Sequence, residues 1–172
     1  MSKLKPPVDP GDHHKGKIDG SVTLVEFGDY ECPHCGRAHP LIKKLLNEIN
    51  DLHFVFRNFP LQEIHPNARI AALAAEAAAN QDRYWEMHDL IFEHQKMLTS
   101  NYLMVLAKKI GLNLQQFEED MKSENVENKV EFDFESGVRS GVNGTPSFFV
   151  NGMPVLTYDE TYESLVEAVE MR

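Results

Sequence analysis

The amino-acid sequence predicts an α/β fold with an inserted all-helical block. Three features predict it: two short β-prone runs on either side of a helical pattern near the start, a helical stretch from residue 66 to about residue 140, and a hairpin signal followed by a last helix. A strand–helix–strand unit and a hairpin–helix unit that share one sheet account for this order. The helical stretch, about 75 residues, is much longer than a crossover connection needs, so we expect it to form a cap beside the sheet.

Length and composition are those of one soluble domain with room for a modest insertion. The chain has 172 residues, of which 42% are hydrophobic and 26% are charged. Its net charge of −10 argues against nucleic acid or an anionic membrane surface as a partner, because both require clustered Lys and Arg. No apolar run approaches the roughly 18 residues of a membrane helix, so membrane insertion is not expected.

The start of the chain carries basic residues without an apolar stretch behind them, which is unlike a signal peptide. The sequence therefore predicts a cytoplasmic protein. A chain from which a signal had been removed would look the same and would be periplasmic or exported. Residues 1–20 are rich in Pro, Gly, Asp, His and Lys, and we expect them to form an irregular leader.

The first half of the α/β part is expected over residues 21–62. Residues 22–27 form a β-prone run that suits a central buried strand. From Pro33 to about Asn50 the apolar positions recur at helical spacing, and residues 52–57 then favour a second strand.

The helical insertion is expected over residues 63–141. Pro66 suits the first position of a helix, and the alanine-rich run after it consists of strong helix formers. Further helices are expected over residues 82–95, residues 100–110, after Asn113, and up to about Gly141.

Residues 142–172 are expected to complete the α/β part. Strands at residues 147–150 and 153–156 flank Asn151-Gly152, and Asn-Gly is the strongest short hairpin signal. Asp159 or Thr161 is expected to cap the last helix.

The two cysteines of the chain, Cys32 and Cys35, lie three positions apart at the junction between the first strand and the first helix. This spacing places Cys32 at the N-cap and Pro33 at the first helical position, so free N–H groups and the positive end of the helix dipole face the Cys32 sulfur. A thiolate there is stabilised and its pKa falls. Cys35, one turn into the helix, is close enough to form a disulfide and should be more buried.

The pair has two other interpretations. Cys32, Cys35 and His39 would form part of a zinc site, but a structural zinc normally needs four ligands and the sequence holds no second cysteine pair. Alternatively, the cysteines would be inert core residues. The strand before the motif and the helix after it favour redox chemistry.

The motif Cys32-Pro33-His34-Cys35 resembles the active-site tetrapeptide of DsbA-like oxidoreductases of the thioredoxin superfamily. Residues 144–152, Gly-Thr-Pro-Ser-Phe-Phe-Val-Asn-Gly, are similar to the cis-proline loop of that superfamily. The resemblance covers about residues 20–170. It implies a thioredoxin-like fold with an inserted all-helical domain, and a dithiol mechanism that needs no organic cofactor and no metal.

The resemblance also implies roles for individual residues. Cys32 matches the nucleophile and Cys35 the resolving thiol. His34 matches the position that tunes the nucleophile, where an imidazole beside the thiolate would favour the anion. Pro146 matches the cis-proline that faces the disulfide, and the backbone of Thr145 matches the edge that pairs with a bound peptide.

Glu26 lies six residues before Cys32, where the family places a buried acid near the resolving cysteine. Strand alternation alone puts Glu26 on the same face as Val22 and Leu24, which is unusual for a carboxylate unless it is used. A proton-relay role is therefore expected, and the alternative is a strand-end carboxylate that reaches water or pairs with Arg57.

Three residues near the motif depart from a strongly oxidising site. Asp29 and Glu31 flank the cysteines, and their charges should oppose the thiolate. Thr145 stands where well-known periplasmic oxidases carry Val. Other conspicuous side chains are expected to be ordinary: Trp85, Met87 and Met104 are expected in the core, and His65, His88 and His94 have no ligand spacing.

The sequence thus predicts a thiol–disulfide oxidoreductase that acts on protein or peptide thiols, with glutathione or a redox recycling protein as further partners. One alternative is a glutathione-dependent transferase or isomerase of the same fold, although that class normally has Ser at the position of Cys32. The other is a metal- or cluster-binding module of thioredoxin fold that shares its ligand across a dimer through Cys32.

Overall fold

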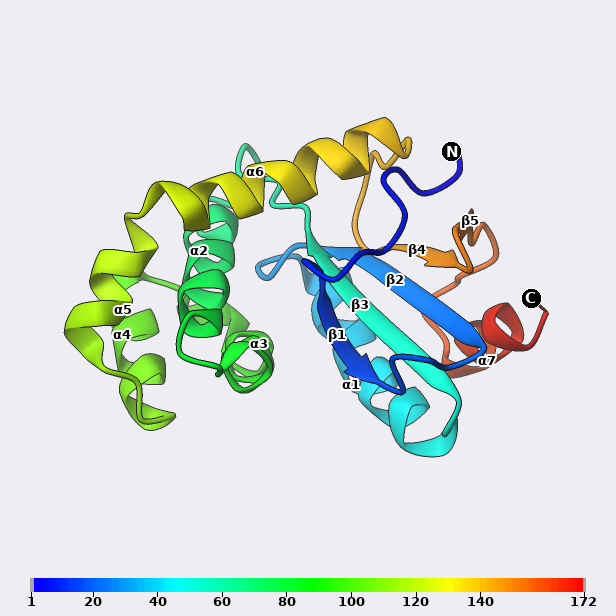
Figure 1. The fold of residues 1–172 in the computed structure, drawn as a ribbon, viewed down its shortest axis with the longest axis horizontal. Helices are drawn as coiled ribbons and strands as arrows, with labels where there is room; N and C mark the ends of the chain where they lie inside the picture. Colours follow the sequence, from blue (N-terminus) through cyan, green and yellow to red (C-terminus); the bar gives the residue numbers. More distant parts are fainter. Residues whose placement is uncertain (1, 172) are drawn as a thin grey trace.

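A computed structural model describes residues 2–171 and contains one five-stranded sheet in the order β1-β3-β2-β4-β5 (Figure 1). The strands are β1 (His13–Gly16), β2 (Val22–Gly28), β3 (Leu52–Asn58), β4 (Ser147–Val150) and β5 (Met153–Pro154). The two central strands, β2 and β3, are parallel, and the other neighbouring pairs are antiparallel. The expected strand–helix–strand and hairpin–helix units are both present around this sheet.

The helices fall into two groups. Two of them, α1 (Pro33–Glu48) and α7 (Tyr162–Glu170), lie together against one face of the sheet (Figure 1). The others form a block beside the sheet: α2 (Ala68–Ala79), α3 (Tyr84–Glu93), the short 3₁₀ helix η1 (Gln95–Met97), α4 (Ser100–Lys109), α5 (Leu114–Met121) and α6 (Glu124–Arg139). The predicted fold class, α/β with an all-helical insertion, is confirmed. None of the helices within residues 2–171 has the length and apolar character to cross a bilayer.

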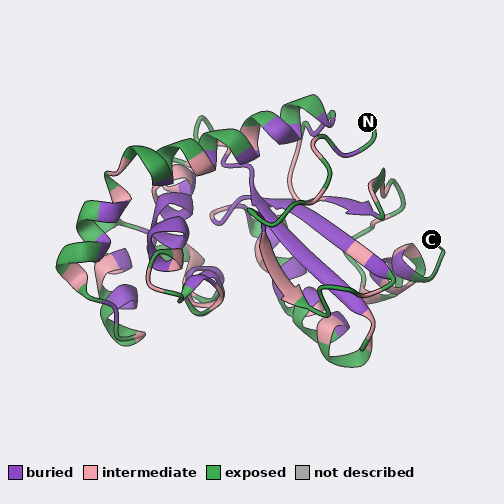
Figure 2. Cartoon of the chain, in the orientation of Figure 1, coloured by how far each residue is buried: buried purple, intermediate pink, exposed green. Residues whose placement is uncertain are grey.

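Both faces of the central strands are covered, and Figure 2 shows β2 and β3 buried along nearly their whole length. Alternation along β2 sends Val22 and Leu24 into the large core under α1, and Val25 and Phe27 into a smaller cluster on the opposite face. Leu4, which is 7% exposed, belongs to that second cluster. The N-terminal segment therefore closes one face of the sheet.

The expectation of an irregular leader over residues 1–20 is wrong for residues 13–16. Residues His13–Gly16 form β1, an edge strand that pairs antiparallel with β3 and aligns His13 with Phe56. This strand has no apolar alternation, so the sequence pattern missed it. Its contacts are polar: the His13 ring bonds to Glu76 of α2 at 2.7 Å, and the indole N–H of Trp85 donates to the carbonyl of His14 at 2.9 Å.

The C-terminal hairpin turns at Asn151 and Gly152, with φ of 49° and 80°. Positive φ at both central residues is the conformation that Asn-Gly adopts most readily, as the sequence predicts. The second strand is shorter than expected, because β5 ends at Pro154. Of the two expected caps for α7, Thr161 is the one whose side chain accepts from the backbone N–H of Ser164.

Candidate active site

The end of β2 and the start of α1 position the cysteine pair. Cys32 is the N-cap of α1, with φ −69° and ψ 123°, and Pro33 occupies the first helical turn as predicted. The carbonyl of Cys32 accepts the first intrahelical bond, from the N–H of Gly36 at 3.0 Å. The Cys32 sulfur is therefore held at the helix N-terminus, where the backbone N–H groups point at it.

The two thiols have opposite acidities. A hydrogen bond from the Cys35 thiol, assisted by Thr145 and by the backbone N–H groups of Cys35 and His34, lowers the pKa of Cys32 to about 5 in spite of its burial. Burial raises the pKa of Cys35 well above its ordinary value, and the neighbouring Cys32 and Glu26 raise it further. One sulfur is thus a thiolate at neutral pH and the other keeps its proton.

Exposure separates the two sulfurs less than expected. Cys32 is only 3% exposed and Cys35 is fully buried, so both lie beneath the surface. The backbone N–H of Asp29 points at the Cys35 sulfur at 3.4 Å. Helix position and hydrogen bonding, more than solvent access, make Cys32 the nucleophile.

Glu26 lies in the core under α1, on the same face as Leu24, as strand alternation predicts. It is 2% exposed, and its Oε1 finds no hydrogen-bond partner among residues 2–171. Burial, together with the negative charge of Cys32, raises the pKa of Glu26 to about 8.

The alternative role for Glu26, an ion pair with Arg57, is not what the structure contains. Arg57 points to the opposite face of the sheet, where its guanidinium makes two 2.8 Å bonds to Asp12 and donates to the carbonyls of Pro6 and Pro7. The Glu26 carboxyl therefore shares the electrostatics of Cys32 and Cys35, and among residues 2–171 it forms no salt bridge.

The loop before β4 faces the nucleophile. The Thr145–Pro146 peptide bond is cis, and the carbonyl oxygen of Thr145 lies 3.6 Å from the Cys32 sulfur. Residues far apart in sequence, one at the start of α1 and the other before β4, thus meet at the reactive atom.

His34 is placed differently from the expected imidazole beside the thiolate. Its exposed ring pairs through Nδ1 with the carboxylate of Glu160, and the guanidinium of Arg37 lies 2.8 Å from the same nitrogen. His34 acts on Cys32 through its backbone N–H. The side chain turns to the carboxylate of Glu160, which lies 126 positions away in the chain, so no local pattern could place it nearby.

Asp29 and Glu31 were expected to oppose the thiolate, and the structure uses them to hold the loop. The buried carboxylate of Asp29 accepts from the backbone of Glu31 at 2.8 Å and of Leu61 at 3.0 Å, and bonds to His65 Nδ1 at 2.7 Å. Glu31 accepts from the backbone of Asn67 at 3.0 Å. Both acids therefore tie the active-site turn to the segment that enters the helical block.

Gln95, in η1, is a contributor that sequence reasoning missed. Its side-chain amide donates to the carbonyls of Tyr30 and Cys32 at 2.8 and 2.9 Å. A Cβ at Gly36 would overlap this amide, so any larger residue there would displace the Gln95 side chain from the first turn of α1. A lone glutamine in a helical stretch carries no signal in the sequence that it reaches the active site.

Comparison with solved structures identifies proteins of the same architecture. A thioredoxin-like oxidoreductase from Silicibacter pomeroyi DSS-3 is 29% identical, with a TM-score of 0.86 over 95% of this chain and 92% of that chain. Oxidised BdbD from Bacillus subtilis is 28% identical, with a TM-score of 0.83 over 94% and 92%. The thiol–disulfide exchange protein α-DsbA2 from Wolbachia pipientis is 22% identical and shares the fold, with a TM-score of 0.80 over 95% and 88%.

Curated relatives carry a similar domain within longer chains. The Na⁺/H⁺ antiporter NhaA 1 of Salinispora arenicola is 43% identical over 150 residues, and the antiporter NhaA of Herminiimonas arsenicoxydans is 40% identical over 169 residues. These matches cover 87% and 96% of this chain but 23% and 27% of the relatives, so the chain spans about a quarter of their length.

A family model for thioredoxin matches residues 8–171, almost the whole chain. The Silicibacter pomeroyi oxidoreductase and BdbD align along nearly their full length and share the architecture of this protein, which carries its cysteine pair at the start of α1. The chain therefore belongs to the thioredoxin family and is a DsbA-like oxidoreductase that performs thiol–disulfide exchange through Cys32 and Cys35.

Proposed function

We propose that this chain exchanges disulfides with extended segments of protein or peptide substrates, and that Glu26 moves the proton of the resolving thiol. The observation that carries the proposal is the opposite acidity of two neighbouring sulfurs, a pKa of about 5 for Cys32 and a strongly raised pKa for Cys35. A pair of this kind attacks with one sulfur and keeps the other in reserve.

In the reducing direction, the Cys32 thiolate attacks one sulfur of a substrate disulfide. A mixed disulfide forms, and the other substrate sulfur leaves as a thiolate. Cys35 then loses its proton and attacks the Cys32 sulfur, so that the second substrate sulfur leaves and the Cys32–Cys35 disulfide remains. The substrate gains two electrons and the cysteine pair loses them; the reverse sequence oxidises a substrate dithiol.

The proton of Cys35 needs an acceptor at the second step, and the neighbouring charges suggest Glu26. While Cys32 is a thiolate, its negative charge raises the pKa values of both Glu26 and Cys35. Formation of the mixed disulfide removes that charge, so both pKa values fall, and a larger fraction of Glu26 ionises by releasing its proton to solvent. The Glu26 carboxylate then accepts the Cys35 proton as Cys35 becomes the attacking thiolate.

The loop at Thr145 supports the docking half of the proposal. Its carbonyl oxygen lies 3.6 Å from the Cys32 sulfur, so a peptide that pairs with the Thr145 backbone would bring its own sulfur to Cys32. Glutathione would react at the same cysteine, but it offers a shorter backbone for pairing with the Thr145 loop. We propose glutathione, or a recycling protein, as the partner that restores the starting redox state.

Trapping experiments test the order of attack. Cys35→Ser should accumulate mixed disulfides with a cysteine-containing peptide, whereas Cys32→Ser should not. Equal trapping by the two variants would contradict the assignment of the nucleophile.

Single-turnover kinetics test Glu26. Glu26→Gln should slow release of the mixed disulfide by about tenfold or more, the lower range for general-base catalysis, while the first attack stays nearly unchanged. Glu160→Gln is the matched control, because it removes a carboxylate from the exposed side of the same site. If Glu26→Gln leaves both steps unchanged, or if Glu160→Gln slows release as much, Glu26 is not the proton acceptor.

A further inference from the structure

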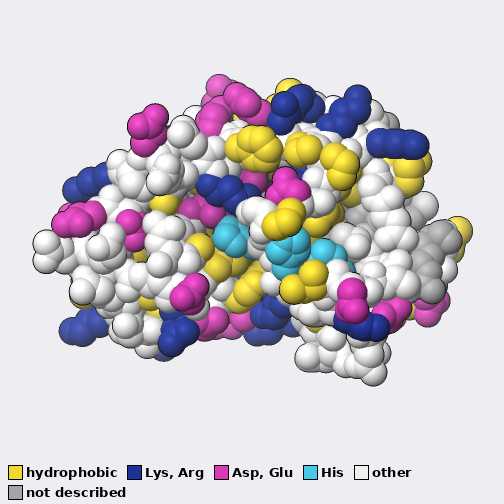
Figure 3. Space-filling model, in the orientation of Figure 1, with side chains coloured by type: hydrophobic (Ala, Val, Ile, Leu, Met, Phe, Trp, Pro, Cys, Tyr) yellow, Lys and Arg dark blue, Asp and Glu magenta, His cyan; other side chains and the backbone are white. Residues whose placement is uncertain are grey.

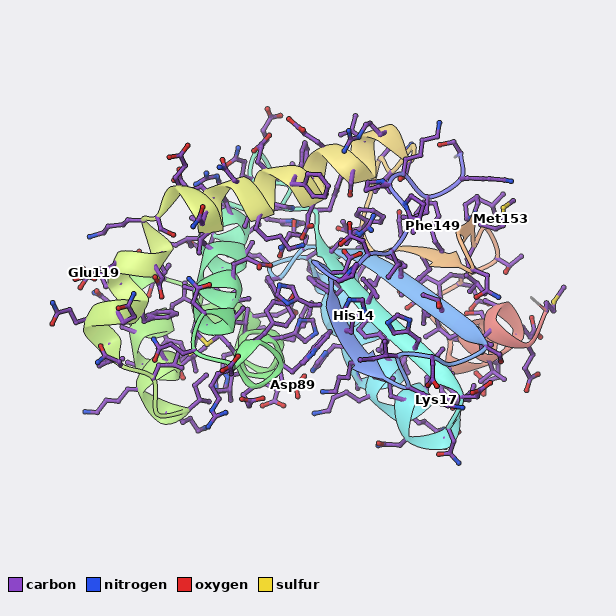
Figure 4. All side chains as sticks on the ribbon, viewed as in Figure 1. His14, Lys17, Asp89, Glu119, Phe149 and Met153 are labelled. Atoms are coloured by element: carbon purple, nitrogen blue, oxygen red, sulfur yellow. The ribbon has the colours of Figure 1, made fainter. Side chains whose placement is uncertain are left out.

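Outside the cysteine site, three potential metal ligands meet between α1 and α3: His39 of α1, and His88 and Asp89 of α3. One donor atom from each lies within 4.8 Å of the other two. Figure 4 shows Asp89 on the side of α3 that faces the sheet and α1. His39 is one helical turn beyond Cys35, and its ring packs against His88 and Phe92 of α3. Within residues 2–171, Cys32, Cys35 and His39 do not come together as a ligand group, so the zinc cluster suggested by their spacing is not formed.

The ring of His39 has a buried nitrogen in need of a partner. The residue is 8% exposed, and its Nε2 makes no hydrogen bond within the described residues 2–171. Asp89 Oδ1 lies 3.4 Å away, within ion-pair distance but without hydrogen-bond geometry. A buried polar atom left unpaired costs stability, so its retention points to a ligand for this nitrogen.

His88 is oriented as metal-binding histidines usually are. Its Nδ1 lies 2.8 Å from the hydroxyl of Tyr30, which in turn lies 3.1 Å from the hydroxyl of Tyr84. If the Nδ1–H donates to Tyr30, the lone pair is on Nε2, on the opposite side of the ring. A hydrogen bond on the second ring nitrogen commonly fixes both the tautomer and the orientation of a metal-bound imidazole.

We propose that His39, His88 and Asp89 bind a divalent transition-metal ion, with Zn²⁺ the ion whose geometry fits. Zinc binds imidazole nitrogen and carboxylate oxygen at about 2.1 Å in a tetrahedron, whose ligands are then about 3.4 Å apart. The 3.4 Å between His39 Nε2 and Asp89 Oδ1 already has this length. The third ligand, His88, has its donor atom within 4.8 Å of the other two and must move closer to complete the set, and water takes the fourth position.

The charges around the site do not block binding. Lys43 bonds to the other oxygen of Asp89, Oδ2, at 3.4 Å, which leaves Oδ1 directed at His39. Lys43 and Lys15 oppose a cation and limit its affinity. Because α1 belongs to the thioredoxin part and α3 to the insertion, the ion would join the two parts of the molecule.

The test uses the oxidised chain, in which the Cys32–Cys35 disulfide leaves no thiolate to bind zinc. Titration calorimetry with Zn²⁺ should give one ion per chain, and Co²⁺ should give a visible ligand-field absorption band. Zinc should also raise the melting temperature, because only the folded chain brings the three ligands together.

Variants connect binding to these residues. His39→Gln and Asp89→Asn should each weaken zinc binding by about tenfold or more and abolish the zinc-dependent rise in melting temperature. Asp89 is partly exposed, and Asp89→Asn preserves the shape of the side chain. This variant therefore still tests the site if His39→Gln does not fold. Circular dichroism of both variants should match the parent.

His53→Gln is the matched control. His53 and His14 form the other close histidine pair, 2.8 Å apart on β3 and β1, and Figure 3 shows histidine side chains gathered over this part of the sheet. The control should bind zinc as the parent does. The proposal fails if the oxidised parent does not saturate with millimolar zinc, if His39→Gln and Asp89→Asn bind as tightly as the parent, or if binding is lost in His53→Gln.

Discussion

Cys32 owes the largest part of its low pKa to the hydrogen bond from the Cys35 thiol. The helix N-terminus adds the N–H groups of Cys35 and His34, and burial works against all of them. The same Cys32 charge raises the pKa of Glu26 below it. Three groups at the site therefore titrate as one system, in which removal of one charge changes the other two.

Substitution of Cys35 separates these contributions. Cys35→Ala removes the hydrogen-bond donor, so the pKa of Cys32 should rise from about 5 toward its ordinary value of 9.0. Cys35→Ser keeps a donor and should raise it less. The pH dependence of the alkylation rate measures both values, and identical midpoints in the parent and both variants would show that the helix N-terminus alone sets the acidity.

At the scale of elements, the active-site turn is held from the helical block. Gln95 of η1 donates to two carbonyls of the turn, while Asp29 and Glu31 accept from the backbone at residues 61 and 67. These bonds join the active-site turn to the helical block and to the segment that enters it. Their loss should destabilise the first turn of α1.

A double-mutant cycle between Gly36 and Gln95 tests this attachment. Gln95→Ala loses two hydrogen bonds and should lower the free energy of unfolding by about 1–2 kcal/mol. Gly36→Ala should also be destabilising in the parent, because the new methyl displaces the amide. In the Gln95→Ala background the same methyl has room and should stabilise α1, by up to about 1 kcal/mol. Denaturant unfolding measures all four proteins, and simple additivity would contradict the contact.

At the scale of the whole molecule, a buried polar network joins the helical block to the sheet. Asp133 of α6 accepts from the backbone and side chain of Asn58 at 3.0 and 2.9 Å, and from Lys129 at 2.6 Å. Glu76 of α2 continues the network to Asn58 and His13. Burial raises the pKa of Asp133 to about 6 against the opposing charge of Lys129.

Lys129→Ala should therefore destabilise the protein in a pH-dependent way. Without its counter-charge, Asp133 is buried alone, at a cost of about 3–5 kcal/mol where it is ionised. A group with a raised folded pKa gives full stability below its unfolded pKa and loses it as pH rises through the folded value. The loss should be larger at pH 8 than at pH 5. Lys122→Ala, which removes an exposed pair with Glu118, should cost at most about 0.5 kcal/mol at either pH.

The redox state should also change the stability of the whole chain, and its pH dependence should be opposite to that of Asp133: the stability of the reduced form rises with pH. The Cys32 thiolate, with its pKa lowered from 9.0 to about 5, contributes about 3 kcal/mol at pH 7, and this is lost as pH falls through 5. A disulfide that closes so short a loop contributes about 2 kcal/mol. Thermal melts should thus find the reduced form at least as stable at pH 7 to 8, and the oxidised form more stable near pH 5. A higher melting temperature for the oxidised form at both pH values would refute this.

Local sequence determined much of the molecule. The strand and helix periods predicted the fold class and the cysteine-bearing helix. Adjacent residues determined the Asn151-Gly152 turn and the Cys32 N-cap, and the alternation of β2 placed Glu26 on the core face. In each case the residues that set the structure are neighbours in the chain, so backbone conformation and side-chain period are enough to predict it.

Tertiary structure alone decided the contacts between distant elements. The polar edge strand β1 exists because β3 offers it a partner, and the ring of His34 turns to Glu160, which lies before α7. Gln95 and the His39–His88–Asp89 cluster likewise bring together residues from α1 and the helical block. These residues lie up to 126 positions apart. Their meeting depends on how the helices pack on the sheet, and a single sequence carries no periodic signal for such long-range pairs.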